Sequence, residues 1–211
     1  MSNLNLEEQE QLAGLKAWWG QYGNAIVLVV SAASIVVAGW QGWRWHQRGE
    51  ATNASALYQT LAKGLGDGDA KVVRDAGGEL LEKYPRTLYA SMGALASARH
   101  HFGRGDSKSA RVQLQWVIDK STSEEFRDIA RLRLAGLLLD EKAYDEALKL
   151  LEAKHAATFA AQYAALKGDI LVAKDQAAEA KSAYKLALEK AGADSDAFRD
   201  SVQMRLDALG G

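Results

Sequence analysis

The longest run of hydrophobic positions in this chain extends from Ala25 to Trp45, and no charged residue lies between Lys16 and Arg44. A helix rises about 1.5 Å per residue, so Tyr22–Trp40 alone would cross the roughly 30 Å hydrocarbon layer of a bilayer. A core helix of a soluble protein rarely needs such a length. We therefore expect residues 22–43 to form a transmembrane helix that contacts the lipid bilayer.

Aromatic residues flank this run on both sides. Five of the six tryptophans lie there: Trp18, Trp19, Trp40, Trp43 and Trp45. Amphipathic rings are enriched at the two headgroup layers of a membrane, a placement that a buried core helix does not explain. A cleaved export signal would start with basic residues and have a shorter apolar core, whereas Glu7, Glu8 and Glu10 precede this one. The segment is expected to stay in place as an uncleaved anchor.

Within the anchor, Ser34, Ala38 and Gly42 are spaced four residues apart and share one helix face. Small residues on such a face allow a second membrane helix to approach closely. Small residues are also common in membrane helices that have no such role. Helix packing through this face and a purely incidental spacing both remain open.

The chain after the anchor repeats a pattern of small and large residues. Ala110, Ala147 and Ala180 are separated by 37 and 33 residues. In each copy the residue twelve positions earlier is also small, and the residue four positions later is large. These flanking positions are Ala98, Ala135 and Gly168 before, and Leu114, Leu151 and Tyr184 after. Tetratricopeptide repeats show this pattern, because small residues let the two antiparallel helices of a repeat meet closely.

The expected fold is all-α: a tetratricopeptide-like solenoid of helical hairpins preceded by one transmembrane helix. A single proline and many strong helix formers favour helix, and polar turns interrupt the pattern inside each repeat. The third turn, AKDQA at 173–177, has no glycine and is the least typical. The expected boundaries are 1–21 for an N-terminal tail, 22–43 for the membrane helix, 44–55 for a juxtamembrane link and 56–211 for the repeat domain, with a degenerate first hairpin at 56–85, repeats at about 88–120, 125–155 and 160–191, and a capping helix at 195–209.

Composition argues against several classes of function. The chain has no cysteine, and from residue 51 onward it carries 23 basic and 23 acidic residues, a balance that offers no field for nucleic acid. His100 and His101 are adjacent on a helix and face different directions, so they cannot hold a metal together. GLGDGD at 64–69 lacks the Lys-Ser/Thr of a phosphate-binding loop. We expect no enzyme activity, no metal or cofactor and no small-molecule substrate.

Protein binding is the expected role of the repeats. In tetratricopeptide proteins the first helix of each hairpin lines a concave groove. The matching positions expected to bind a partner are Arg99, Phe102, Leu132, Leu139, Asp140, Gln162 and Asp169. Met92, Leu95 and Ile129 share this face, which is unusually apolar for a receptor of acidic peptide tails. The groove could hold an unfolded chain or an apolar segment, or the protein's own flanking helices could close it.

Four stretches resemble one known family along essentially the whole chain. They are GWQGWRWHQ at the end of the anchor, SALYQ, YASMGALASARHHF and ARLRLAGLLLDEKAYDEALKLLE. In this order they resemble the bacterial ancillary SecYEG translocon subunit family (YfgM-like). The resemblance implies a single-pass protein of the inner membrane with a cytoplasmic N-terminus and a periplasmic C-terminal domain. It also implies association with the SecYEG translocon and with a membrane-anchored periplasmic chaperone (PpiD-like), in support of exported proteins.

The charges beside the anchor point the other way. One basic residue, Lys16, precedes the anchor and two, Arg44 and Arg48, follow it, which favours a cytoplasmic C-terminal domain. The difference is one charge, and we give the resemblance more weight. Two alternatives remain open: a coordinator of cell-envelope or division proteins, and a cytoplasmic-facing regulator if the topology is reversed.

Overall fold

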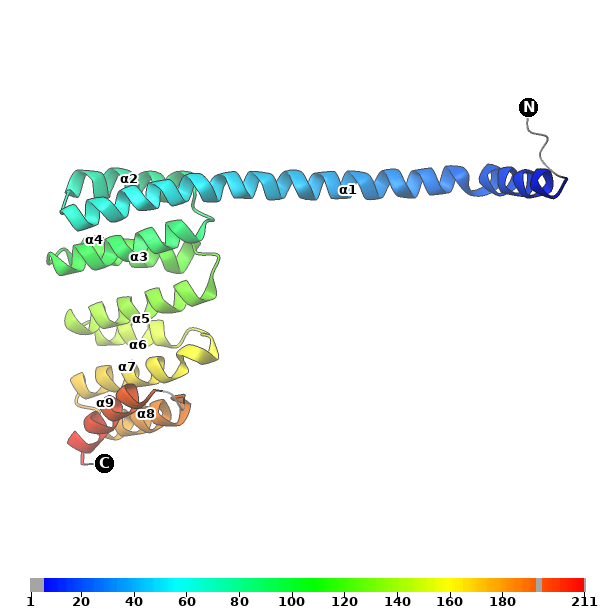
Figure 1. The fold of residues 1–211 in the computed structure, drawn as a ribbon. Coiled ribbons are helices and arrows are strands. Elements are labelled where there is room, and N and C mark those ends of the chain that lie inside the picture. Colours follow the sequence, from blue (N-terminus) through cyan, green and yellow to red (C-terminus); the bar gives the residue numbers. More distant parts are fainter. Residues whose placement is uncertain (1–5, 193–194, 211) are drawn as a thin grey trace. The chain divides into compact units, whose positions relative to one another are not determined.

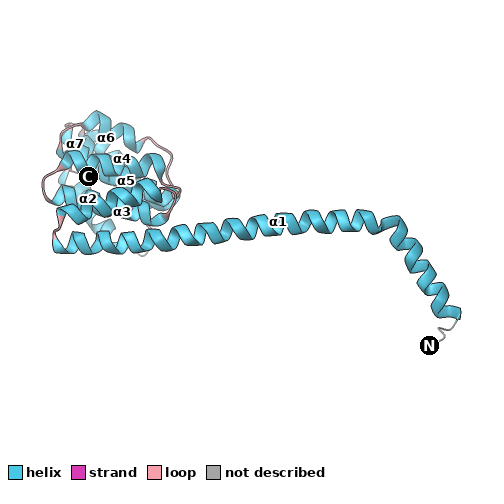
Figure 2. Cartoon of the chain, turned by 90° about the horizontal axis from the view of Figure 1, so that it is seen from above, coloured by secondary structure: helices cyan, strands magenta, loops and turns pink. Residues whose placement is uncertain are grey.

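The computed structural model describes residues 6–192 and 195–210. In these ranges the backbone forms helices and turns and contains no strand (Figure 2). The chain divides into an N-terminal unit, Met1–Gly49, and a C-terminal unit, Glu50–Gly211. Helix α1 (Leu6–Asp67) contributes residues to both units. The all-α fold class expected from the sequence is confirmed.

The described part of the N-terminal unit is a helix whose apolar side chains are exposed. Leu28, Ile35 and Val36 are each at least 70% exposed. Among the described residues, α1 provides one helix that is long and apolar enough to cross a membrane, judged by length and composition. Arg44 lies 4.5 Å from the ring centroid of Trp40, a cation–π contact at the end of the apolar run. Such a surface is costly in water and ordinary in lipid.

The small residues of the anchor leave one face of α1 uncovered. Ser34, Ala38 and Gly42 are exposed, and the Ser34 hydroxyl donates to the Val30 carbonyl at 2.8 Å within the same helix. Their role in packing against another membrane helix stays a prediction. Residues 44–55, expected to form a juxtamembrane link, have helical backbone and belong to α1.

The C-terminal unit is a stack of helical hairpins. Figure 1 shows the hairpins following one another in chain order, and consecutive helices form most of the contacts. Residues 88–120, 125–155 and 160–191, each expected to form one repeat, contain the hairpins α3–α4, α5–α6 and α7–α8. The helix bounds are α2 (Ala70–Lys83), α3 (Leu88–Gly103), α4 (Ser107–Lys120), α5 (Glu124–Asp140), α6 (Tyr144–Leu151), α7 (Ala160–Ala173), α8 (Ala177–Lys190) and α9 (Asp196–Ala208), with a short 3₁₀ helix, η1 (Ala157–Phe159), before α7.

Every hairpin turns through one residue in the left-handed backbone conformation. These residues are Gly68 (φ 72°), Gly105 (φ 79°), Lys142 (φ 61°) and Asp175 (φ 60°). In each turn the next backbone N–H donates to the carbonyl five residues earlier and satisfies a helix end. The bonds run from Asp69 to Gly64, Asp106 to His101, Ala143 to Leu138 and Gln176 to Leu171, at 2.8–2.9 Å. The two turns without glycine, at Lys142 and Asp175, close as the others do, although a side chain in this conformation costs about 1–2 kcal/mol.

The repeat-defining small residues lie at buried helix contacts. Five of them are at most 3% exposed: Ala98, Ala110, Ala135, Ala147 and Ala180. At Gly168 the contact is even closer, because a Cβ atom there would lie 2.4 Å from Cε1 of Tyr184. Both residues belong to the same hairpin, Gly168 in α7 and Tyr184 in α8. A larger side chain at any of these positions would force the paired helices apart.

Three hydrophobic clusters of described residues hold the stack together. The first joins the end of α1 to α2 and α3, the second runs from α3 to α7, and the third joins α7, α8 and α9. Val202 and Leu206 of α9 are buried in the third cluster. Helix α9 therefore covers the apolar face that the last hairpin would expose, as a solenoid cap does.

Candidate functional site

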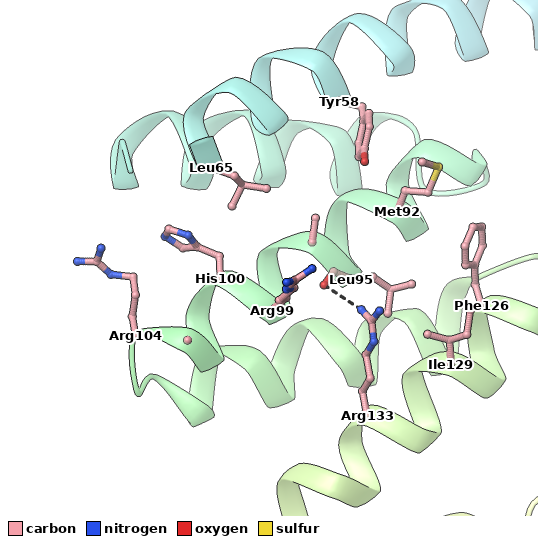
Figure 3. A pocket seen from close by; sticks show the side chains of 12 residues that line it. Tyr58, Leu65, Met92, Leu95, Arg99, His100, Arg104, Phe126, Ile129 and Arg133 are labelled. Atoms are coloured by element: carbon pink, nitrogen blue, oxygen red, sulfur yellow. Dashed lines mark hydrogen bonds between the residues drawn. The ribbon is translucent and has the colours of Figure 1, made fainter. Parts of the chain in front are cut away.

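A cavity of about 690 Å³ lies between the end of α1, α3 and α5. Figure 3 shows its side chains, which come from three successive hairpins. The lining residues are Tyr58 and Leu65 from α1, Met92, Leu95, Ala96, Arg99, His100 and Gly103 from α3, Arg104 just after α3, and Phe126, Ile129 and Arg133 from α5. We call this cavity the α3–α5 groove.

Helical spacing places these residues on the groove. On α5, Phe126, Ile129 and Arg133 follow one another at intervals of three and four residues, so they share one helix face. On α3, Met92 and Arg99 lie seven residues apart, close to two full turns. Both faces combine large apolar groups with arginine.

The charges that line the groove are positive. Arg133 donates from Nη1 to the Leu95 carbonyl at 3.4 Å and makes no ion pair within the described residues. Burial lowers the pKa of the Arg133 guanidinium, and the nearby positive charge of Arg99 lowers it further. None of the described residues that line the groove is acidic. The groove thus combines an apolar wall with an unbalanced positive charge.

A second cavity, of about 500 Å³, adjoins the first and shares Arg99 and Arg133 with it. Three residues expected to bind a partner, Phe102, Leu139 and Asp140, line this second cavity. The Phe102 ring is 48% exposed, whereas Leu139 is half-buried against the central hydrophobic cluster. Arg99 is the expected binding residue that lines both cavities, and the binding role of all four stays a prediction.

The other residues expected in the groove lie elsewhere. Leu132 packs against the central hydrophobic cluster, and Gln162 is exposed on α7. Asp169 accepts hydrogen bonds from Nη1 of Arg205 at 2.8 and 3.0 Å and from the Tyr184 hydroxyl at 2.8 Å. Burial and the Asp169 carboxylate raise the pKa of Tyr184. Because Arg205 belongs to α9, the capping helix pairs with the Asp169 carboxylate, which was expected to lie in the partner-binding groove.

Sequence reasoning missed part of the groove. Tyr58 and Leu65 belong to the degenerate first hairpin, whose positions could not be aligned with those of the later repeats. Arg104 lies after the end of α3, outside the helical pattern. A signal for Arg133 and Phe126 did exist, because both are spaced from Ile129 by one helical turn.

A buried carboxylate away from the groove was also missed. Asp128 is 1% exposed and accepts hydrogen bonds from Arg131 Nη1 at 2.9 Å, the Ala156 backbone N–H at 2.9 Å and the Tyr163 hydroxyl at 3.1 Å. Burial and the Asp128 charge raise the pKa of Tyr163 to about 12. With donors from α5, α7 and the segment before η1, this carboxylate joins two successive hairpins.

The two adjacent histidines differ in their surroundings. Their rings meet edge to face at 6.0 Å; His100 lines the groove, while His101 Nδ1 lies 3.3 Å from the carboxylate of Asp106. In the part of the chain that the structure describes, no group of three or more His, Cys, Asp or Glu residues is placed to hold a metal ion.

Comparison with known families covers almost the whole chain. The profile of the tetratricopeptide repeat-like domain family matches residues 16–211. The chain belongs to this family. The match begins before the apolar run, so the family profile of this tetratricopeptide repeat-like protein covers both the apolar segment and the hairpin stack.

Several curated proteins are similar to this tetratricopeptide repeat-like protein from end to end. The ancillary SecYEG translocon subunit of Neisseria gonorrhoeae is 29% identical over 97% of this chain and 98% of its own. The proteins of the same name from Haemophilus influenzae and Escherichia coli are each 27% identical, over 97% and 96% of this chain and 98% and 96% of their own. No solved structure matches the chain. The relatives share the name of an accessory subunit of a protein assembly.

Proposed function

We propose that this protein is a membrane-anchored scaffold for protein–protein interaction that works with the SecYEG translocon and assists exported proteins. The observation that carries this proposal is the similarity, over 96–97% of the chain, to proteins named ancillary SecYEG translocon subunit. The hairpin stack supports it, because such repeats present extended concave surfaces suited to protein partners. The groove, with apolar and cationic side chains on neighbouring helices, is such a surface.

The proposed arrangement places the two units in different environments. Residues 22–43 would lie in the inner membrane, with 1–21 in the cytoplasm and the repeat domain, 56–211, in the periplasm. The exposed apolar side chains of α1 support the membrane segment. A membrane-anchored periplasmic chaperone (PpiD-like) is the proposed second partner on the periplasmic side.

Affinity purification of the full-length protein in mild detergent is expected to recover translocon subunits. The matched control replaces residues 22–43 with an unrelated single-span helix, which keeps the domain at the membrane. If the anchor contacts the translocon, the control recovers less of it; if the repeat domain makes the contact, recovery is unchanged. Recovery of division or wall-synthesis proteins in place of translocon subunits would contradict the proposal.

Topology is tested separately with two reporters fused after Gly211. Alkaline phosphatase, which folds only in the periplasm, is expected to be active, and green fluorescent protein exported through the same route is expected to be dark. The similarity to proteins named ancillary SecYEG translocon subunit is the basis for this expectation, against the excess of one basic residue after the apolar run. The opposite pair of signals would place the domain in the cytoplasm, and the proposed assistance to exported proteins would fail with it.

A further inference from the structure

We propose that the α3–α5 groove binds a protein segment that carries acidic and apolar side chains together. A carboxylate of the segment would lie between Arg99 and Arg133, and its apolar side chains would pack against Tyr58, Met92 and Phe126. This inference rests on the proposed scaffold function and names the chemistry of the partner that the groove takes.

Three arginines of the groove, Arg99, Arg104 and Arg133, have no acidic partner within the described residues. Arg99 and Arg104 make no hydrogen bond or ion pair through their side chains within the described residues, and Arg133 contacts a backbone carbonyl. Several other arginines of the domain are paired with carboxylates, although Arg199 donates only to backbone carbonyls. Such pairs are Arg111 with Glu146, Arg127 with Glu124, Arg131 with Asp128 and Arg205 with Asp169. Three arginines without a carboxylate partner therefore line one groove that has no acidic residue among its described lining.

The two central arginines also repel each other. Both side chains are directed into the same cavity in Figure 3, and the charge of Arg99 disfavours the charged form of Arg133. Two like charges held close together without a counter-ion raise the energy of the free protein. A carboxylate placed between them would remove this repulsion and accept charge-assisted hydrogen bonds from both guanidinium groups.

The apolar side chains beside the arginines favour a ligand that also carries apolar groups. Tyr58, Met92, Phe126 and Ile129 line the groove as half-buried side chains. A free anion would leave these surfaces in water, whereas a peptide side chain next to the carboxylate would cover them. The ligand is therefore amphipathic.

The shape of the site favours a chain over a single headgroup. The two cavities meet at Arg99 and Arg133, so the site continues along α3 and α5 towards Phe102 and Leu139. Asp140 lies in the second cavity and disfavours a second carboxylate there. An anionic lipid surface would prefer a cluster of about four to eight basic residues, whereas this unit is neutral overall.

The test is a selection from a displayed library of random peptides of about 12 residues, on full-length protein in nanodiscs after depletion on empty nanodiscs. The wild-type protein is expected to enrich peptides that combine Asp or Glu with large apolar residues. The double variant Arg99→Glu/Arg133→Glu is expected to lose these peptides. A selected peptide should bind the double variant about 10- to 100-fold more weakly than it binds the wild type. The same peptide with Gln or Asn in place of Glu or Asp should bind the wild type more weakly by a similar factor.

The control variant is Lys149→Glu/Lys185→Glu, which changes the net charge by the same amount at exposed positions on α6 and α8. It is expected to bind the selected peptide as the wild type does. Thermal unfolding checks that each variant is folded. If the glutamate variant is not, Arg99→Gln/Arg133→Gln takes its place.

Four results overturn the inference: no enrichment of peptides, enrichment without acidic residues, equal binding by the arginine variant, or equal loss in the lysine control. Binding of short-chain phosphatidylglycerol that depends on Arg99 and Arg133, without selected peptides, would instead assign the groove to a lipid headgroup. Purification of translocon subunits with the same variants separates the two proposals. If the wild type selects acidic, apolar peptides but recovers no translocon, the scaffold partner is wrong and the groove chemistry stands.

Discussion

Replacing Asp128 with alanine is expected to lower the free energy of unfolding of the repeat domain by about 3–5 kcal/mol. The substitution removes one acceptor and leaves three donors, on Arg131, Ala156 and Tyr163, without it. A buried donor without an acceptor has lost its hydrogen bonds to water and gains none in the folded protein, which raises the free energy of the folded state. The partly buried guanidinium of Arg131 would also carry an unpaired charge. Urea unfolding of the full-length protein in mild detergent, followed by circular dichroism, measures the change.

The control for this variant is Asp140→Ala on the same helix. Asp140 is exposed and makes no hydrogen bond or ion pair within the described residues, so its removal should change the free energy of unfolding by about 0.5 kcal/mol or less. Equal effects of the two substitutions would show that the Asp128 contacts do not stabilise the stack.

Ala147→Leu is expected to destabilise the repeat domain by about 1–3 kcal/mol. Ala147 is 0% exposed and belongs to the central hydrophobic cluster, at the contact between α5 and α6. The added carbons have no free space, so either the helices separate or side chains leave their preferred rotamers. The same unfolding experiment applies, and a lower midpoint with an unchanged denaturant slope is the expected result.

Ala178→Leu is the matched substitution at an exposed helical alanine on α8. Both changes add the same atoms to a helix, and alanine and leucine differ little in helix propensity. The exposed variant should therefore unfold like the wild type. If Ala147→Leu also unfolds like the wild type, the assignment of Ala147 to the closest approach of its hairpin is wrong.

The four hairpin turns have the same backbone geometry, although only two of them have glycine at the left-handed position. Glycine marks the turns at Gly68 and Gly105, and the sequence offers no such mark at Lys142 or Asp175. All four close with the same hydrogen-bond pattern, because helix ends need it and the paired helices impose the geometry. The spacing of small and large residues predicts hairpins here without any signal from the turns.

The groove was predicted less completely than the fold. The expected face included Arg99 but not Arg133, so it was described as apolar and poorly suited to acidic ligands. The structure brings these two arginines together from different hairpins, and neither pairs with a carboxylate of the described part of the chain. Asp169, expected to lie among the partner-binding positions of the groove, accepts hydrogen bonds from Arg205 of the capping helix.

The sequence by itself determined the all-α class of the fold, the apolar N-terminal segment and the spacing of small and large residues that predicts the repeats. These features depend on composition and on spacings of three, four and about 34 residues, which the chain carries locally. Only the tertiary structure decided which charges find partners. The stacking of the hairpins pairs Asp128 with Tyr163 and Asp169 with Arg205. It also places Arg99 beside Arg133 without a carboxylate partner among the described residues. These contacts join residues about 35 positions apart in the sequence. Helical periodicity predicts which face of a helix a residue lies on, but it does not predict which residue of the next helix it contacts.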